Sequence, residues 1–575
     1  MTDFAWLTAT GITPLIGVAV IVALPKGREV LVKQVALLTS LVVLALVIAV
    51  GARFESGGPR FQFTEAHDWI STFGVQYAVG IDGIALVLIA LVAVLVPVVL
   101  LASWHDADPA VVRENATGVV ATATPVPAAT AGGGSTIVLQ KGGGPADSAI
   151  SGSPDDGASR SVKTFFSMML VLETMMIGVF AATDIFLFYV FFEAMLIPMY
   201  FLIGSYGGPR RSYAAVKFLL FSLFGGLLML ASVIGLYVAS GNQLESGTFN
   251  FQTLTQLELS TEHQIWLFLG FFVAFAIKAP LFPFHTWLPD AGAEAPVGGA
   301  VLLVGVLDKV GTFGFIRYCL PLFPDASREL APYVITLSVI GILYGSLLAM
   351  GQKDLKRLIS YTSVAHFGFI GLGVFAFTTQ AQTGAVLYMV NHGLSTGALF
   401  MVIGFLIVRG KSRNADDYSG IANVAPLLAG AFLIAGLSSL ALPGLSTFIS
   451  EFLVLVGTFT RYEVAAVLAT VGIVLAALYI LLAYQKTMQG PLSPAHVSMP
   501  DLGVREVLAI APLIALMVFL GFYPKPLIDV INPAVACTQV DLGFTDPAPT
   551  QPAAAGGDGA TEPPFCLVAT SPGEQ

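Results

Sequence analysis

The chain carries little charge and few cysteines for its length. Lys and Arg total 26 and Asp and Glu total 36, so charged residues make up 11% of the 575 residues, against about 25% in a typical soluble domain. So few charges cannot cover a water-soluble globule, and a hydrophobic content of 56% excludes disorder over most of the chain. The net charge of -10 excludes a strongly basic nucleic-acid-binding protein. Three cysteines are too few for a four-Cys zinc site or an iron–sulfur cluster.

Long apolar runs recur along the whole chain and indicate a polytopic membrane protein. A bilayer core needs about 20 apolar residues per helix, and uniformly apolar runs of this length do not suit the alternating strands of a membrane β-barrel. The sequence therefore predicts an all-α membrane protein with about fourteen transmembrane helices. Their expected ranges are 5–24, 31–50, 82–103, 164–182, 184–204, 213–239, 264–283, 294–317, 331–350, 359–377, 383–408, 424–447, 463–484 and 505–523.

The distribution of basic residues sets the predicted orientation. If both termini lie on the outer face, the inner loops carry 17 of the 26 Lys and Arg residues and the outer loops carry six. Inner loops of membrane proteins are enriched in Lys and Arg in this way. The remaining three, Lys217, Lys278 and Lys309, fall within spans. The sequence therefore predicts a multi-pass membrane protein with both termini outside.

Two segments have compositions that do not suit a membrane. Residues 104–163 are rich in Gly, Ala, Ser, Thr and Pro, which is typical of a low-complexity linker and predicts an inner loop. Residues 524–575 are rich in Pro and acidic residues and are expected to form an outer tail. Because Cys537 and Cys566 both lie in this tail, on the oxidising face, we predict a disulfide between them. Two unpaired thiols are the alternative.

Charged side chains inside the predicted spans are the main functional signal. An ionisable residue at mid-membrane costs about 2.5–3.5 kcal/mol on insertion scales. Glu193 is a lone carboxylate in an apolar run and requires a cation, for which Lys217 and Lys278 are candidates. Lys309 follows Asp308 directly, and neighbours in sequence point to different faces of a helix. The alternatives are a purely structural ion pair and a lysine that snorkels to the membrane surface.

Two of the spans are interrupted by residues that cannot continue a helix. Lys278 is followed closely by Pro280 and Pro283. Glu451 follows a second interruption at Pro443. Prolines free backbone carbonyls, and a broken helix with an ionisable group near the break is typical of an ion site.

Equal spacings between ionisable residues indicate an internal repeat. Glu193 and His366 are 173 residues apart, and so are Lys278 and Glu451. Spans four to eight and nine to thirteen both number five, and an odd number inverts the second unit relative to the first. Inverted repeats with broken helices at corresponding positions indicate an ion path near the midplane. The expected units are 1–103 (three helices), 104–163 (inner loop), 164–317 and 331–484 (two inverted five-helix repeats), 505–523 (last helix) and 524–575 (outer tail).

Histidines in spans ten and eleven add to the ionisable set. His366 and His392 lie in apolar surroundings within these spans. Histidine titrates near neutral pH and can relay protons, although a membrane histidine can instead donate to a backbone carbonyl.

Four sequence blocks carry a resemblance to a known family. They are residues 192–200 (FEAMLIPMY), 278–290 (KAPLFPFHTWLPD), 363–368 (SVAHFG) and 391–394 (NHGL). On these blocks the chain resembles the antiporter-like membrane subunits of respiratory complex I, NADH-quinone oxidoreductase, over all fourteen spans. Glu451 favours the subunit M branch, whose mitochondrial counterpart is subunit 4, because the sister subunits and related cation/proton antiporters usually have lysine there.

The resemblance implies a role in proton translocation for the ionisable residues. Glu193 and Lys278 resemble the interacting pair of an inward-facing half-channel in the first repeat. Lys309, with His366 and His392, resembles the central link between the repeats.

The resemblance extends to the outward-facing half-channel and to the partners. Glu451 would be its terminal group in the second repeat, and Lys217 and Asp184 would have supporting roles. Proton transfer would be driven by quinone reduction elsewhere in the complex, so this chain would carry no catalytic redox residue, cofactor or metal. FMN, iron–sulfur clusters and quinone are expected in partner subunits, with sister antiporter-like subunits on either side.

The chain departs from the family pattern at two positions and in one loop. Gly292 stands where the family usually has histidine, which weakens any relay through that turn. Asp308 stands where the family usually has an apolar residue, and its charge can hold Lys309 protonated. The long 104–163 loop is also unusual for the family.

Three other functions suit a polytopic membrane protein. A subunit of a multisubunit sodium/proton antiporter shares the fold, but Glu451 argues against it. A stand-alone secondary transporter would need a substrate-specific polar cluster, which the spans lack. A structural membrane anchor would not justify the cost of Glu193, Lys278 and Glu451 in the spans. The sequence therefore favours a proton-translocating subunit of complex I.

Overall fold

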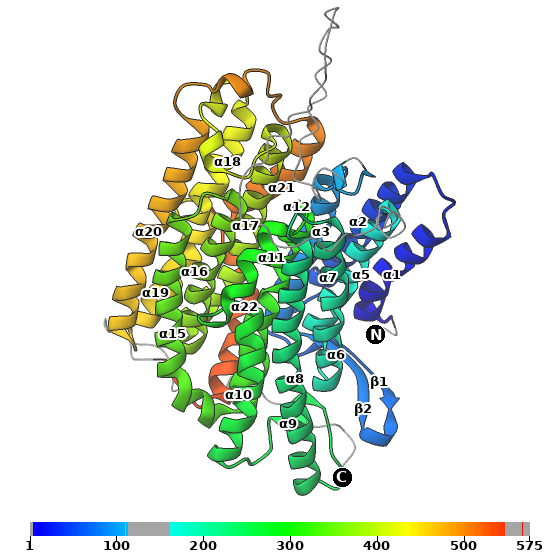
Figure 1. Cartoon of the computed structure of the whole chain (residues 1–575). Helices are drawn as coiled ribbons and strands as arrows, with labels where there is room; N and C mark the ends of the chain where they lie inside the picture. The colour runs from blue at the N-terminus through cyan, green and yellow to red at the C-terminus, as the bar shows by residue number, and fades with distance from the viewer. Residues whose placement is uncertain (1–3, 110, 113–160, 547–565, 567–575) are drawn as a thin grey trace, which may run out of the picture.

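The computed structural model describes residues 4–109, 111–112, 161–546 and 566, so most of the predicted 104–163 loop and the end of the predicted tail lie outside the described residues. Within the described part, 12 helices are long and apolar enough to cross a membrane, and two shorter apolar helices accompany them (Figure 1). This confirms the predicted fold class of a mostly helical polytopic membrane protein.

The helices follow one another in four groups. The N-terminal group contains α1 (Trp6–Ala23), α2 (Glu29–Gly51), the strands β1 (Gln62–Ile70) and β2 (Val75–Ile81), and α3 (Gly83–Ala102). The first predicted repeat contains α5 (Val162–Ala181), α6 (Ile185–Ala194), α7 (Leu196–Tyr206), α8 (Arg211–Gln243), α9 (Phe251–Leu254), α10 (Thr261–Lys278), η3 (Phe284–Trp287), α11 (Leu288–Glu294), α12 (Val297–Leu302), η4 (Leu303–Leu307), α13 (Lys309–Gly314), η5 (Phe315–Cys319) and α14 (Leu320–Leu322). The second contains α15 (Pro324–Met350), α16 (Leu355–Phe375), α17 (Thr379–Gly410), α18 (Pro426–Ser439), α19 (Ser446–Phe459) and α20 (Glu463–Met488). The last group contains α21 (Val504–Phe522) and α22 (Lys525–Asp541).

A β-hairpin at one end of the bundle was not part of the sequence prediction. We call the end that holds the connections α7–α8, α15–α16 and α17–α18 the inner end, as the basic residues predict. The hairpin β1–β2 lies at the opposite, outer end (Figure 1) and pairs antiparallel, with Ala66 opposite Ala78. Since β1 is largely exposed and polar, it lacks the apolar alternation by which a strand is recognised in sequence.

Both predicted helix breaks are present. α10 ends at Lys278, and the chain resumes regular turns only in η3 and α11. α18 ends before Leu440 and α19 begins at Ser446, and between them Ala441 and Gly444 have positive φ values of 61° and 93°. The two longest described helices, α8 with 33 residues and α17 with 32, pack against the broken helices of their own repeats. Each broken helix therefore packs against one long unbroken helix.

The helix that carries Lys309 is irregular. The sequence predicts one span over 294–317, but the structure contains two π-helical turns, η4 and η5, on either side of α13. π-Helical turns disturb the regular pairing of backbone carbonyls and occur frequently at functional sites. This span is also fully buried by its neighbours, so its polar side chains face protein rather than lipid.

The predicted outer tail begins with a helix. The sequence assigns the whole of 524–575 to a Pro- and acid-rich tail, whereas its first part forms α22, which packs against α3 and α17. The Pro-rich composition of the later part of the segment outweighs the apolar residues of this partly buried helix in the sequence prediction. Arg60 Nη2 lies 2.6 Å from Asp541 Oδ2 and fastens the end of α22. Cys537 of α22 forms a disulfide with Cys566.

Candidate functional site

Glu193 and Lys278 interact electrostatically, but no hydrogen bond joins them. Glu193 lies in the last turn of α6, and Lys278 is the last residue of α10. Neither Glu193 Oε1 nor Lys278 Nζ has a hydrogen-bond partner among the described residues, although the two charges interact. Lys278 Nζ lies 5.1 Å from the ring centre of Phe192 and 5.6 Å from that of Phe218, close enough for cation–π attraction. We call Glu193 and Lys278 the acid–lysine pair.

Two glycines in α8 make room for the acid–lysine pair. A Cβ atom at Gly226 would lie 1.6 Å from Glu193 Oε1. A Cβ atom at Gly225 would lie 2.9 Å from Ala274 Cα in α10. Sequence reasoning did not single out these glycines, although a Gly-Gly pair in the middle of a span is a signal of close approach between helices.

Lys217 binds Asp290 rather than Glu193. Lys217 Nζ donates to Asp290 Oδ2 at 2.8 Å, and Arg357 Nη1 donates to Asp290 Oδ1 at 2.6 Å. Burial alone would raise the pKa of Asp290, but these two hydrogen bonds and charges outweigh burial and lower it. Of the two cations that the sequence offers for Glu193, the structure therefore leaves only Lys278 beside it.

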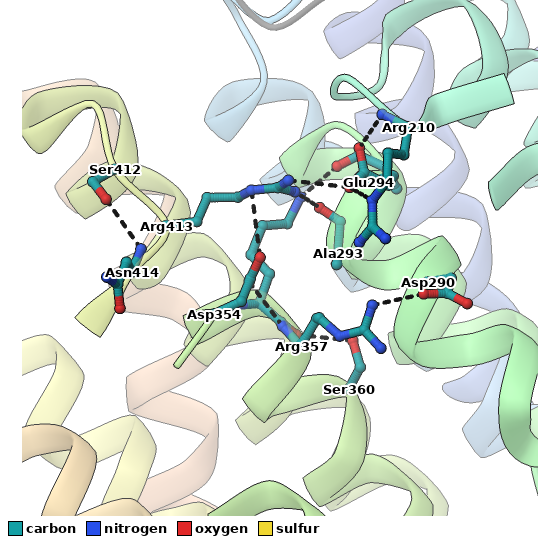
Figure 2. Close-up of polar contacts among 12 residues, drawn as sticks. Arg210, Asp290, Ala293, Glu294, Asp354, Arg357, Ser360, Ser412, Arg413 and Asn414 are labelled. Atoms are coloured by element: carbon teal, nitrogen blue, oxygen red, sulfur yellow. Dashed lines mark hydrogen bonds and ion pairs between the residues drawn. The ribbon is translucent and has the colours of Figure 1, made fainter. Parts of the chain in front are cut away.

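A second group of ion pairs fixes α11 at the inner end. Figure 2 shows that Arg413, after α17, points toward both Glu294 and Asp354. Arg413 Nη2 lies 3.1 Å from Glu294 Oε1, and Arg413 Nε lies 3.5 Å from Asp354 Oδ2. The backbone N–H of Arg210 donates to Glu294 Oε2 at 3.0 Å. These contacts join α11 to the segments before α8, before α16 and after α17.

Gly292 has no room for a side chain. It lies in α11, and a Cβ atom there would be 2.4 Å from Ser360 Oγ of α16. The histidine that the resemblance leads one to expect would collide with α16 in this packing. Glycine in place of the expected histidine therefore allows α11 to pack closely against α16.

Lys309 reaches from α13 to α17. Lys309 Nζ donates to His392 Nδ1 at 2.7 Å and to the carbonyl oxygen of Val304 in the π-helical turn η4. Asp308 lies beside Lys309 in sequence and is fully buried, yet neither of its carboxyl oxygens has a hydrogen-bond partner among the described residues. Lys309 is thus held by a histidine and a backbone carbonyl, without direct contact with the adjacent acid.

The contacts continue from His392 to Glu451. The ring centres of His392 and His366 lie 5.1 Å apart, and those of His366 and Tyr388 lie 5.7 Å apart. The Tyr388 hydroxyl donates to Glu451 Oε1. We call Lys309, His392, His366, Tyr388 and Glu451 together the polar row.

Tyr388 is the member of the polar row that sequence reasoning missed. It lies one helical turn before His392 on α17, so the two side chains share a face of that helix. Asn391 of the same helix anchors the second helix break, because its Nδ2 donates to the Ser446 carbonyl at 2.8 Å. All five side chains of the polar row lie inside the protein, which suits transfer of protons between neighbouring groups rather than binding of a large solute.

Asp184 lies apart from the polar row, at the outer end of α6. Its carboxylate accepts from the backbone N–H of Leu187 at 2.9 Å, as a helix cap, and from that of Gln76 in β2 at 3.2 Å. Asp184 therefore joins the first repeat to the hairpin. No group of three His, Cys, Asp or Glu side chains among the described residues is placed to hold a metal ion.

Comparison with known proteins agrees with this architecture. A family model described as the membrane part of NADH:quinone oxidoreductase and Mrp antiporters matches residues 182–476. NADH-quinone oxidoreductase subunit M of Mycobacterium tuberculosis H37Rv is 47% identical over 557 residues, which cover 96% of this chain and 97% of the relative. NADH-ubiquinone oxidoreductase chain 4 of Marchantia polymorpha is 34% identical over 525 residues, covering 91% and 94%.

Solved structures give the same result. A chain of respiratory complex I from Thermus thermophilus with bound NADH superposes with a TM-score of 0.78 at 29% identity, covering 94% of this chain and 100% of that one. A chain of the Mrp complex from Dietzia sp. DQ12-45-1b has a TM-score of 0.75 at 18% identity, covering 94% and 100%, and so shares the fold. The chain therefore belongs to the family of NADH-quinone oxidoreductase subunit M, the antiporter-like membrane subunits of complex I.

Proposed function

We propose that this complex I subunit moves protons from the inner to the outer face of the membrane through two half-channels joined by the polar row. The observation that supports the proposal most strongly is the buried row of side chains from Lys309 to Glu451, which is hydrogen-bonded at both ends and packed ring against ring in between. Buried ionisable groups are expensive in a membrane and mark proton relays in pumps and transporters.

The first half-channel delivers a proton to the acid–lysine pair. Glu193 is only partly buried, whereas Lys278 is 1% exposed, so the carboxylate is the more accessible of the two. A proton taken up by Glu193 passes to Lys278 Nζ, which is held by aromatic rings and the opposite charge. Lys278 then passes its proton toward Lys309.

The second half-channel releases the proton. Lys309 Nζ transfers a proton to His392 Nδ1, and the histidine then releases its other ring proton toward His366. From His366 the proton reaches Glu451 by way of the Tyr388 hydroxyl. Glu451 lies in α19, beyond the second helix break, and discharges to the outer face.

The energy for these transfers comes from partner subunits. As a subunit of complex I, the chain works beside subunits that hold FMN, iron–sulfur clusters and quinone, and beside sister antiporter-like subunits on either side. Conformational and electrostatic changes that follow quinone reduction reach the acid–lysine pair from its neighbours. We place the chain in a bacterial plasma membrane with both termini outside.

The test is proton translocation by the assembled complex. Lys278→Ala and Glu193→Ala should each remove this subunit's share of the protons moved per NADH oxidised, measured in inside-out membrane vesicles. NADH oxidation with an artificial soluble electron acceptor should stay normal, which shows that the redox arm is assembled. Unchanged translocation in both variants would remove the acid–lysine pair from the path.

A further inference from the structure

The acid–lysine pair and the polar row are separated by a gap. Lys278 ends α10 and Lys309 begins α13, and no hydrogen bond joins the two lysines among the described residues. Because Lys278 Nζ has no hydrogen-bond partner among the described residues and Lys309 Nζ is bound to His392 and Val304, a group between the lysines that takes a proton from one and gives it to the other would connect them.

Asp308 faces this gap. It lies one helical turn before Gly311, so the two residues share a face of the helix. A Cβ atom at Gly311 would lie 2.5 Å from the backbone nitrogen of Ala279, the residue after Lys278. The face of α13 that carries Asp308 is therefore pressed against the end of α10.

The adjacent residue faces the opposite neighbour. Successive residues on a helix are about 100° apart around its axis, and Lys309 reaches His392 of α17. Asp308 thus faces the acid–lysine pair while Lys309 faces the polar row. The carboxylate interacts electrostatically with both Lys278 and Lys309.

The surroundings of Asp308 leave its carboxyl group free to act. The residue is fully buried, and both carboxyl oxygens lack a hydrogen-bond partner among the described residues. A buried carboxylate of purely structural function is normally satisfied by hydrogen bonds or a direct ion pair. Asp308 has neither within the described residues, although it interacts electrostatically with both lysines.

We propose that Asp308 carries the proton from Lys278 to Lys309, a proposal that rests on the function proposed above. The Lys278 ammonium gives one proton to the Asp308 carboxylate, which leaves a neutral amine and a carboxylic acid. The acid then gives that proton to the neutral Lys309 amine. Asp308 returns to the carboxylate, and Lys309 becomes the ammonium that donates to His392.

Asp308→Asn in the complete complex tests the proposal, since asparagine keeps the shape but cannot carry the proton. We expect the protons moved per NADH oxidised to fall as far as in Lys278→Ala. Asp308→Glu should restore the ratio. Glu173→Gln is the matched control, because Glu173 of α5 is also fully buried with two unpartnered oxygens within the described residues, but contacts neither lysine.

A second readout separates proton carriage from a structural role. Infrared difference spectra recorded on NADH addition should show a protonated-carboxyl band that is lost in Asp308→Asn and kept in Glu173→Gln. If Asp308→Asn fails to assemble, the wild-type complex with carboxyl-labelled aspartate should show that band shifted.

The outcomes are distinct. Normal translocation by Asp308→Asn together with loss in Lys278→Ala would overturn the role of Asp308 and leave the pathway intact. Normal translocation in both variants would overturn the pathway itself. Absence of any aspartate carboxyl band during turnover would also overturn the role of Asp308.

Discussion

The two halves of the proposed pathway lie on different helices and differ in how their charged groups are held. In the first predicted repeat, Glu193 and Lys278 interact across space, and Glu193 Oε1 and Lys278 Nζ lack hydrogen-bond partners among the described residues. In the second repeat, the Tyr388 hydroxyl binds Glu451 directly, and two histidine rings lead from Tyr388 to Lys309. The first half holds separated charge, whereas the second is hydrogen-bonded at its two ends, Lys309–His392 and Tyr388–Glu451, and packed ring against ring through His366 between them.

This difference indicates that the two halves are controlled differently. Separated charges in a low-dielectric interior respond strongly to a nearby electrostatic change, because the interaction energy of two charges rises as the effective dielectric constant falls. The second half has fewer separated charges, because Lys309 and Glu451 are each held by a hydrogen bond within the polar row. We therefore propose that partner subunits act on the acid–lysine pair and that the polar row passes the proton on.

Removal of the Tyr388 hydroxyl should break the second half with the largest effect. In Tyr388→Phe, Glu451 loses its donor, and a hydrogen bond to a charged group contributes about 1.5–3 kcal/mol. Proton transfer to Glu451 should then slow by roughly 10-fold or more, given that about 1.4 kcal/mol corresponds to a factor of ten. Vesicle proton-translocation rates measure this.

Tyr479→Phe is the control for that change. Tyr479 is also buried near Glu451, but its hydroxyl has no partner among the described residues. It should translocate protons normally. Equal rates in the two phenylalanine variants would contradict a role for Tyr388 in the relay.

Gly226→Ala should disturb the first half without changing a charge. The new methyl group would collide with Glu193 Oε1, so the carboxylate must move and its interaction with Lys278 must weaken. Translocation should fall severalfold while the redox arm stays active. Gly430→Ala serves as the control, because a Cβ atom at Gly430 of α18 meets nothing within 4 Å.

Asp290→Asn should have a smaller effect, on stability rather than on the relay. Lys217 and Arg357 lower the pKa of Asp290, so its ion pairs stabilise the fold above the ordinary pKa of 3.8 and lose this contribution as the pH falls through the lowered value. Loss of the carboxylate should cost about 1 kcal/mol. Thermal unfolding at neutral pH measures the cost, and an unfolding temperature equal to wild type would show that these pairs add nothing.

Reduction of the disulfide between Cys537 and Cys566 should have the smallest effect on translocation. The bond lies in the segment after the last predicted span. Intact-mass measurement should show a gain of two hydrogen atoms on reduction. Alkylation of both thiols without prior reduction would rule the bond out.

Much of this architecture can be predicted from sequence because each membrane helix is recognised from its own run of apolar residues. Apolar runs and prolines fix the spans and both breaks, and lone charges within spans mark Glu193, Lys278 and Glu451. The pairing of side chains cannot be predicted in this way, because it depends on packing between segments that are distant in sequence. The bond from Tyr388 to Glu451 joins α17 to α19, and the choice of Asp290 as the partner of Lys217 is decided by α11 at the inner end.

The central claim is that the two halves act in series, and a double variant tests it most directly. Protons moved per NADH should be measured in purified complex reconstituted in vesicles, for Lys278→Ala, Glu451→Ala and the two together. Sister subunits keep the ratio above zero, so the account predicts the same partial loss in all three. A double variant with clearly greater loss than either single one would show two independent paths and contradict the account.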